Sequence, residues 1–255
     1  MELKDKVVVV TGATGDVGPG VCLTLAKDGA KVVCVANNRD RLDALQKRMD
    51  EAGYTAMTIS CDITCIEKVQ EMRQKIHEVF GPIDMLVNMA GGVLFPYGLT
   101  PEETQFMDKD FEQIRKVINL NLFGTLICTH ELAKDMVEMK QGKIVNVGSI
   151  DGIRGSDGKA DYAASKGGII AFTKSMAQEL SRYHIYCNSV CLGQISNGRE
   201  KDNSKEDSWA KYGKGALVGR FGEPEEVGYL ISFLLSNKSD YITGQNYIIG
   251  GGCYL

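Results

Sequence analysis

The chain has 255 residues, of which 44% are apolar and 24% are charged, and its formal net charge is −4. These proportions exclude a mainly disordered, collagen-like or coiled-coil protein, and the length is sufficient for one large hydrophobic core. The slight acidic excess argues against nucleic acid and anionic membrane as partners, because both attract basic surfaces.

No window approaches the roughly 18 uncharged apolar residues that a membrane span needs, and no apolar signal segment precedes the first strand. The eight cysteines include no CxxC pair, and the three histidines are scattered. We therefore expect no metal site, and a cytoplasmic protein whose thiols are reduced core residues.

Short apolar runs alternate with segments of helical period along the chain. The runs predict strands over 7–10, 32–35, 56–60, 83–88, 143–147, 185–190 and 247–249. Helices are predicted over 42–52, 69–79, 110–140, 162–181 and 223–235. Continuous rather than alternating apolar runs indicate strands that are covered on both faces. The fold class predicted for residues 1–255 is therefore a single α/β domain, a doubly wound parallel sheet of about seven strands.

A glycine-rich loop, residues 11–20, joins the first strand to a helix. In this context Gly12 permits a tight turn, Gly15 lets the backbone approach a pyrophosphate, and Gly18 lets the helix pack closely on the strand. The helix N-terminus adds N–H groups and the positive end of a dipole. The loop predicts a dinucleotide site, and the alternative is an ordinary strand-to-helix turn.

Two further strand ends carry candidate binding residues. Asp62 follows the third strand, where its carboxylate could accept a hydrogen bond from an adenine amino group or serve at a helix start. Asn88 ends the fourth strand and is followed by small residues through Gly92. Small residues there leave space beside a cofactor, and an ordinary turn is equally compatible.

Three residues form a candidate catalytic group. Tyr162 and Lys166 are four positions apart, so they share one face of a helix. The lysine ammonium would favour the phenolate form of the tyrosine and bring its pKa toward neutrality. Ser149 ends the fifth strand, at the sheet edge where ligands bind, and its hydroxyl could donate to a substrate carbonyl oxygen.

In their joint order and spacing these motifs resemble the short-chain dehydrogenase/reductase family over essentially the whole chain. The matching segments are 11–18, Asp62, 88–91, 121–124, Ser149, Tyr162, Lys166, 188–193, 219–226 and 243–252. The resemblance implies a Rossmann-like fold and NAD(P)-dependent hydride transfer between nicotinamide and a secondary alcohol or ketone. Sugars or polyols, hydroxysteroids and 3-oxoacyl thioesters are the candidate substrates.

The resemblance also implies roles for individual residues. Tyr162 would be the general acid/base, Lys166 would lower its pKa and hold the nicotinamide ribose, and Ser149 would polarise the substrate oxygen. Asn121 would hold a water. The implied cofactor contacts are Gly12, Thr14, Gly15, Asp16, Val17, Gly18, Asn37, Arg39, Asp62, Ile63, Asn88, Ala90, Gly91, Tyr162, Lys166, Gly193 and Ile195. Residues 194–215 would form a substrate lid, and the assembly would be a homotetramer or homodimer.

The sequence departs from the family pattern at three positions. Asp16 replaces a glycine, Leu192 replaces the proline before Gly193, and Asn197 replaces a threonine. We expect Asp16 to face solvent or to cap the following helix, because a carboxylate aimed at pyrophosphate would repel it.

The end of the second strand bears on cofactor choice. Ala36 occupies the position at which NAD-preferring members carry an acidic residue, so repulsion against a 2′-phosphate is absent. Asn37, Arg39 and Arg41 could donate to that phosphate, although the arginines could also belong to a solvated helix start. The sequence favours NADP(H) over NAD(H) as the cofactor.

Two alternative functions remain. Asp16, Leu192 and Asn197 are compatible with a dinucleotide-binding sensor or scaffold that has little turnover. The spacing of Gly12, Gly15 and Gly18 resembles that of nucleotide-sugar epimerases, although few residues remain after the sixth strand for the substrate domain that such enzymes need.

Overall fold

The computed structural model describes residues 2–93, 105–196 and 216–253. Its centre is a seven-stranded sheet in the order β3-β2-β1-β4-β5-β6-β7, in which every neighbouring pair is parallel. The strands are β1 (Val7–Thr11), β2 (Lys31–Ala36), β3 (Ala56–Ser60), β4 (Met85–Asn88), β5 (Gly142–Ser149), β6 (Ile185–Leu192) and β7 (Asn246–Ile249). The predicted α/β, Rossmann-like doubly wound fold is confirmed.

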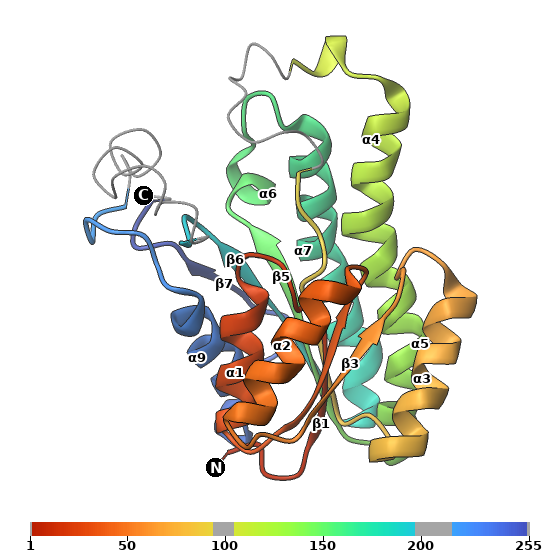
Figure 1. Cartoon of the computed structure of the whole chain (residues 1–255). Coiled ribbons are helices and arrows are strands. Elements are labelled where there is room, and N and C mark those ends of the chain that lie inside the picture. Colours follow the sequence, from red (N-terminus) through yellow and green to blue (C-terminus); the bar gives the residue numbers. More distant parts are fainter. Residues whose placement is uncertain (1, 94–104, 197–215, 254–255) are drawn as a thin grey trace.

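Helices cover both faces of the sheet (Figure 1). One layer contains α1 (Gly18–Lys27), α2 (Arg39–Glu51) and α9 (Pro224–Leu235). The other contains α3 (Ile66–Phe80), α4 (Phe111–Ile118), α5 (Gly124–Met139) and α7 (Ala160–Leu180). A short helix that was not predicted, α6 (Asp151–Arg154), follows the carboxyl end of β5 near the top of Figure 1.

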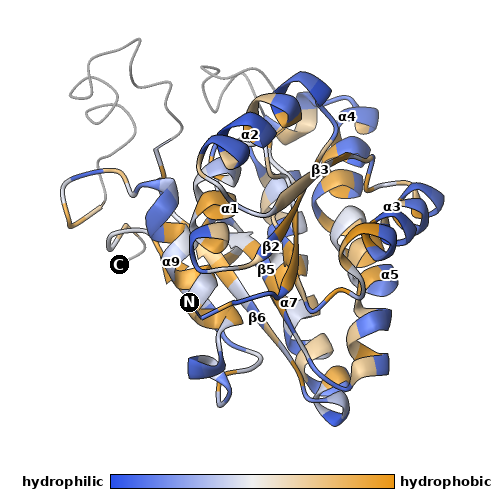
Figure 2. Cartoon of the chain, turned by 60° about the horizontal axis from the view of Figure 1, so that its bottom comes forward, coloured by the Kyte–Doolittle hydropathy of each residue, from blue (hydrophilic) through white to orange (hydrophobic). Residues whose placement is uncertain are grey.

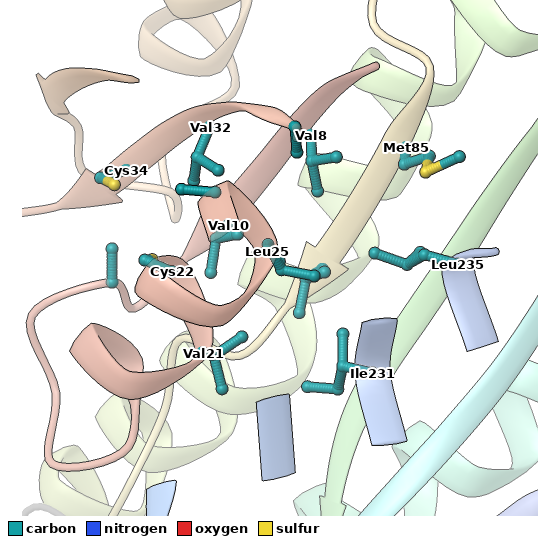
Figure 3. Packing of buried hydrophobic residues seen from close by; sticks show 14 of the residues in the cluster. Val8, Val10, Val21, Cys22, Leu25, Val32, Cys34, Met85, Ile231 and Leu235 are labelled. Carbon is teal, nitrogen blue, oxygen red and sulfur yellow. The ribbon is translucent and has the colours of Figure 1, made fainter. Parts of the chain in front are cut away.

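The four valines of β1 form a continuous apolar run because both faces of the strand are covered. Val8 and Val10 face α1 and α9, where they pack in one core with Leu25 and Ile231 (Figure 3). Val7 and Val9 face the opposite layer and join a second core. Alternate side chains therefore enter two different cores, and none of the four valines is more than 3% exposed. Polar residues gather on the outer faces of helices such as α2 and α3 (Figure 2).

Local capping sets two helix starts. Asn38 precedes α2 and its side chain accepts a hydrogen bond from the Arg41 backbone N–H at 2.9 Å. Glu223 and Glu226 form a capping box at the start of α9, with Pro224 in its first turn. These caps satisfy backbone donors that would otherwise lack intrahelical partners.

The long helix predicted over 110–140 is not a regular α-helix. It consists of α4, a π-helical turn over Asn119–Phe123 and α5. Short π-helical turns inside α-helices frequently lie at functional sites, and this one contains Asn121.

The strand order places the candidate site. The chain passes from β1 outward to β2 and β3, then returns to β4 on the other side of β1. This reversal opens a crevice at the carboxyl ends of β1 and β4, where doubly wound sheets bind ligands. Within the described ranges, no helix is long and apolar enough to cross a membrane.

Candidate active site

Three of the glycines in the loop after β1 face different surroundings. Gly12 has a φ of +73°, and a Cβ built there would lie 2.7 Å from the Ala90 backbone. A Cβ on Gly18 would collide with the backbone of Ala13. A Cβ on Gly15 would meet only the Gly12 carbonyl oxygen, at 3.3 Å. The loop is therefore tightly packed beneath Gly12 and Gly18 but open above Gly15, which fits the close approach of a pyrophosphate.

Thr11 joins the glycine loop to the end of β4. Its hydroxyl accepts hydrogen bonds from the backbone N–H groups of Met89 and Ala90, at 3.1 and 3.2 Å. The sequence analysis included Thr11 only as the start of the loop and missed this function. A hydroxyl residue at a strand end directly before the first glycine was the available signal.

A cavity of about 330 Å³ lies above this junction. It brings together segments that are far apart in the sequence: the glycine loop, the end of β4, the ends of β5 and β6, and α7. The predicted site residues that line it are Gly12, Gly15, Asp16, Val17, Gly18, Gly91, Ser149, Tyr162, Lys166, Gly193 and Ile195.

Lys166 lies beside Tyr162 at the floor of this cavity. Its Nζ is 5.9 Å from the centre of the Tyr162 ring and donates a 2.9 Å hydrogen bond to the Val147 carbonyl oxygen. The lysine side chain is buried, and burial lowers its pKa to about 8. A lysine charge held this close to a phenol favours the phenolate form.

Ser149 is the last residue of β5 and is also buried. Its Oγ accepts a 3.1 Å hydrogen bond from the backbone N–H of Asp151, the first residue of α6. Because the hydroxyl oxygen accepts there, its own O–H can donate elsewhere, as polarisation of a carbonyl oxygen requires. The unpredicted helix α6 thus orients the serine.

Asn121 binds the loop after β4 from the π-helical turn. Its Oδ1 accepts from the Gly92 N–H, and its Nδ2 donates to the carbonyl oxygens of Gly92 and Val117, each at 2.9 Å. A Cβ on Gly91 would collide with Asn121 Oδ1 and lie 3.3 Å from Lys166 Nζ. The fully buried Asn121 is therefore close to Lys166, and the water assigned to it by resemblance stays a prediction.

Asn88, Asp62 and Ile63 are predicted cofactor residues whose side chains contact other parts of the protein. Asn88 is buried, and its Nδ2 donates to Thr129 Oγ1 and Asn146 Oδ1, each at 2.9 Å. Its Oδ1 is buried without a hydrogen-bond partner among the described residues. The side chain of Asn88 thus links β4 to β5 and α5, beneath the cavity.

Asp62 and Ile63 follow β3. Thr64 donates from its hydroxyl and backbone N–H to the Asp62 carboxylate, at 2.7 and 3.0 Å, and these bonds lower the pKa of Asp62. Ile63 is buried against Gly124. A contact from Asp62 to a cofactor would share the carboxylate with Thr64.

A second cavity of about 400 Å³ lies at the ends of β2 and β3 and is lined by Asn37, Asp62 and Lys68, among others. Arg39 is exposed and forms a 3.2 Å ion pair with Asp43 on α2. Asn37 and Asp62 therefore line the same cavity, whereas Arg39 is paired with Asp43 on the surface of α2. Thr14 is half-buried in the glycine loop.

The departures from the family pattern have different outcomes. Asp16 is exposed and lines the first cavity, while Val17 is the residue that precedes α1. A Cβ on Gly193 would lie 2.6 Å from Gly250, which explains a glycine there. Ile195 forms a β-bridge with Gly222. Asn197 and nearly all of the predicted lid over 194–215 lie outside the described residues.

Comparison with known proteins decides the family. The family described as short chain dehydrogenase matches residues 6–208. The chain belongs to the short-chain dehydrogenase/reductase family. The resemblance found in the sequence is thereby confirmed, and the chain is an oxidoreductase that uses NAD(P)(H) and acts on hydroxyl or keto groups of small molecules.

Similar proteins cover the whole chain. The 3-oxoacyl-(acyl-carrier-protein) reductase FabG of Thermotoga maritima is 34% identical over 255 residues, which is 99% of each protein. The (S)-acetoin-forming diacetyl reductase of Staphylococcus epidermidis is 33% identical over 259 residues, covering 97% of this chain and 98% of that protein. A crystal structure of an actinorhodin polyketide ketoreductase variant with NADPH superposes with a TM-score of 0.88 at 29% identity, covering 98% and 97%.

Proposed function

We propose that Tyr162 is the general acid/base of a ketone reduction or alcohol oxidation, assisted by Ser149, Lys166 and Asn121. The observation that supports this proposal is the cavity of about 330 Å³, which gathers Ser149, Tyr162 and Lys166 beside the glycine loop. Asn121 and Lys166 both lie next to Gly91, so Asn121 is close to the lysine.

Each side chain has a separate task in the proposed reaction. In reduction, Ser149 donates a hydrogen bond to the carbonyl oxygen and Tyr162 gives that oxygen its proton as negative charge develops. In oxidation, Tyr162 accepts the hydroxyl proton of the alcohol. The bound nicotinamide supplies or accepts the hydride. Lys166 stabilises the phenolate form between the two steps.

We propose that NADP(H) is preferred over NAD(H). The second strand ends in Ala36 and Asn37, so no carboxylate there opposes a 2′-phosphate. The actinorhodin ketoreductase structure, which is similar over nearly the whole chain, contains NADPH. Asn37 lines the cavity at the ends of β2 and β3, where its side-chain amide could donate to that phosphate.

The proposed substrate is a ketone with a second carbonyl group nearby. The names of the relatives supply this choice, because 3-oxoacyl thioesters and diacetyl both carry a ketone close to another carbonyl. In this proposal the chain is one cytoplasmic domain.

We propose assembly into a homotetramer or homodimer. Phe111 and Phe123 on the α4–α5 helix are 69% and 51% exposed, and Tyr229 on α9 is 60% exposed. Ile248 is 41% exposed on β7, which is an edge strand. Large exposed aromatic and aliphatic side chains are typical of surfaces that bind another subunit.

One observation favours the second candidate, a dinucleotide-binding protein with little turnover. Asp16 lines the cavity, where its carboxylate would oppose the phosphates of a dinucleotide. A titration of the protein with NADPH and with NADH, followed by assays of diacetyl and a 3-oxoacyl thioester, separates the two functions.

We expect tighter binding of NADPH than of NADH, and NADPH-dependent reduction of at least one of the two ketones. Binding without turnover of either ketone would favour the second candidate. Binding of neither dinucleotide would contradict both, and preference for NADH would contradict the cofactor proposal alone.

A further inference from the structure

A buried ion pair lies next to the proposed acid/base. Lys109 Nζ is 2.6 Å from Asp161 Oδ1, and the two side chains are only 8% and 3% exposed. Lys109 stands just before α4, whereas Asp161 is in the first turn of α7. The pair therefore joins two elements that are distant in the sequence.

The Asp161 carboxylate also touches the backbone of Tyr162. Its Oδ1 accepts a 3.0 Å hydrogen bond from the Tyr162 N–H. An unpaired carboxylate at this place would disfavour the phenolate form of Tyr162, because like charges repel in a poorly solvated site. Lys109 supplies the opposite charge at hydrogen-bond distance. The pair therefore has no net charge and should have little effect on the protonation of the phenol.

Other charged groups surround this region from several elements. Lys166 lies on α7, and Lys159 precedes that helix, 3.5 Å from Asp151 of α6. Arg154 of α6 is 3.9 Å from the same aspartate. Among the described residues, the titratable groups near the start of α7 are Lys109, Asp151, Arg154, Lys159, Asp161 and Lys166, together with the buried Cys191 thiol of β6 near Lys166.

We propose that Lys109 is a positioning residue that neutralises Asp161 and thereby sets the pH range over which Tyr162 exchanges its proton. The proposal rests on the function assigned above to Tyr162. It gives Lys109 and Asp161 opposite effects on the tyrosine, which a purely structural role of the pair would not do. Loss of the lysine removes the positive charge that offsets the Asp161 carboxylate, whereas loss of the carboxylate removes the negative charge that offsets the Lys109 ammonium.

The test is the pH profile of kcat/KM for oxidation of acetoin or a 3-hydroxyacyl thioester. Tyr162 acts as a base in this direction, so activity rises as pH passes its pKa. We expect Lys109→Met to move this rising limb upward by roughly half a unit to one unit, and Asp161→Asn to move it downward by a similar amount. The double variant, which restores neutrality, should return the limb close to that of the wild type.

A matched control uses a second ion pair far from the cavity. Lys143 Nζ lies 2.6 Å from Asp240 Oδ1 at the opposite end of the sheet, and its side chain is 7% exposed. Asp240→Asn should leave the limb unchanged. If Lys109→Met fails to fold, the cause is the Asp161 carboxylate, which would then be buried without its lysine. In that case the downward shift in Asp161→Asn and the wild-type limb of the double variant still decide the question.

Limbs that do not move, or that move in the same direction in both single variants, would overturn the proposal. Its failure is distinguishable from failure of the proposed function. If Tyr162→Phe retains full turnover, Tyr162 is not the acid/base and the proposed function is wrong. If Tyr162→Phe is inactive but the limbs do not move, only the assignment of Lys109 is wrong.

Discussion

Lys166 shows how a residue proposed to assist catalysis can oppose stability. Burial lowers its pKa from an ordinary value of 10.5 to about 8. Between these two pH values the unfolded chain binds more protons at this residue than the folded chain does, so its contribution to stability rises with pH. Below pH 8 the folded protein carries the full cost of burying the charge.

Replacing Lys166 by methionine should therefore stabilise the protein without cofactor. We expect the free energy of unfolding at pH 7 to rise by roughly 1–3 kcal/mol, while turnover is lost. The gain should shrink as pH increases from 8 to 10.5. Urea denaturation at several pH values measures it, with Lys174→Met at an exposed position of the same helix as the control. A variant that is less stable than the wild type at every pH would contradict this view of Lys166.

At the scale of elements, the glycine loop combines two requirements in one turn. Gly12 and Gly18 are needed because neighbouring backbone leaves no room for a side chain. Gly15 has no such neighbour except the Gly12 carbonyl oxygen. The sequence predicted three different roles for these glycines. All three line the cavity, but only at Gly15 is there room for a side chain.

A pair of alanine substitutions tests this division. Gly15→Ala should fold with nearly wild-type stability but bind NADPH at least about tenfold more weakly, because its methyl group enters the space above the loop. Gly12→Ala should lose roughly 2 kcal/mol or more of unfolding free energy, since it combines a positive φ with a backbone clash. Thermal unfolding and calorimetric titration of both variants measure the two effects. Equal losses of stability would contradict the division.

Other elements could not be predicted from local sequence. The apolar stripe continues through the π-helical turn at Asn119–Phe123, so its period gives no sign of the extra backbone turn. The four-residue helix α6 is too short to show a period. The Lys109–Asp161 pair and the bonds of Asn88 to Thr129 and Asn146 join distant segments, and such contacts depend on the assembled fold.

At the scale of the whole molecule, two-sided burial of the sheet made the fold predictable. Strand β1 begins with four consecutive valines, and this pattern can be recognised in the sequence without knowledge of any contact. The gathering of Ser149, Tyr162 and Lys166 around one cavity was predictable, because Tyr162 and Lys166 share a helix and Ser149 ends a strand. The arrangement of subunits was not predictable in this way, because exposed and core stripes look alike in a helix.

The exposed apolar residues give a test of assembly. We expect Phe123→Glu to reduce the particle mass in light scattering, because a charge would be buried in the proposed subunit contact. Val79→Glu on α3 is a matched control, since Val79 is also exposed, at 60%, and lies on a helix outside the proposed subunit contact. A wild-type protein that is already a monomer would contradict the proposed assembly.

The most direct test of the central claim is the turnover of Tyr162→Phe with NADPH and the ketone that the wild type reduces best. Removing only the phenolic oxygen should lower kcat by about a hundredfold or more, while the Kd for NADPH, measured by calorimetry, stays close to that of the wild type. Tyr229→Phe, at an exposed position of α9, should retain full activity. Wild-type turnover by Tyr162→Phe would contradict the account, because the proton would then have to come from another group.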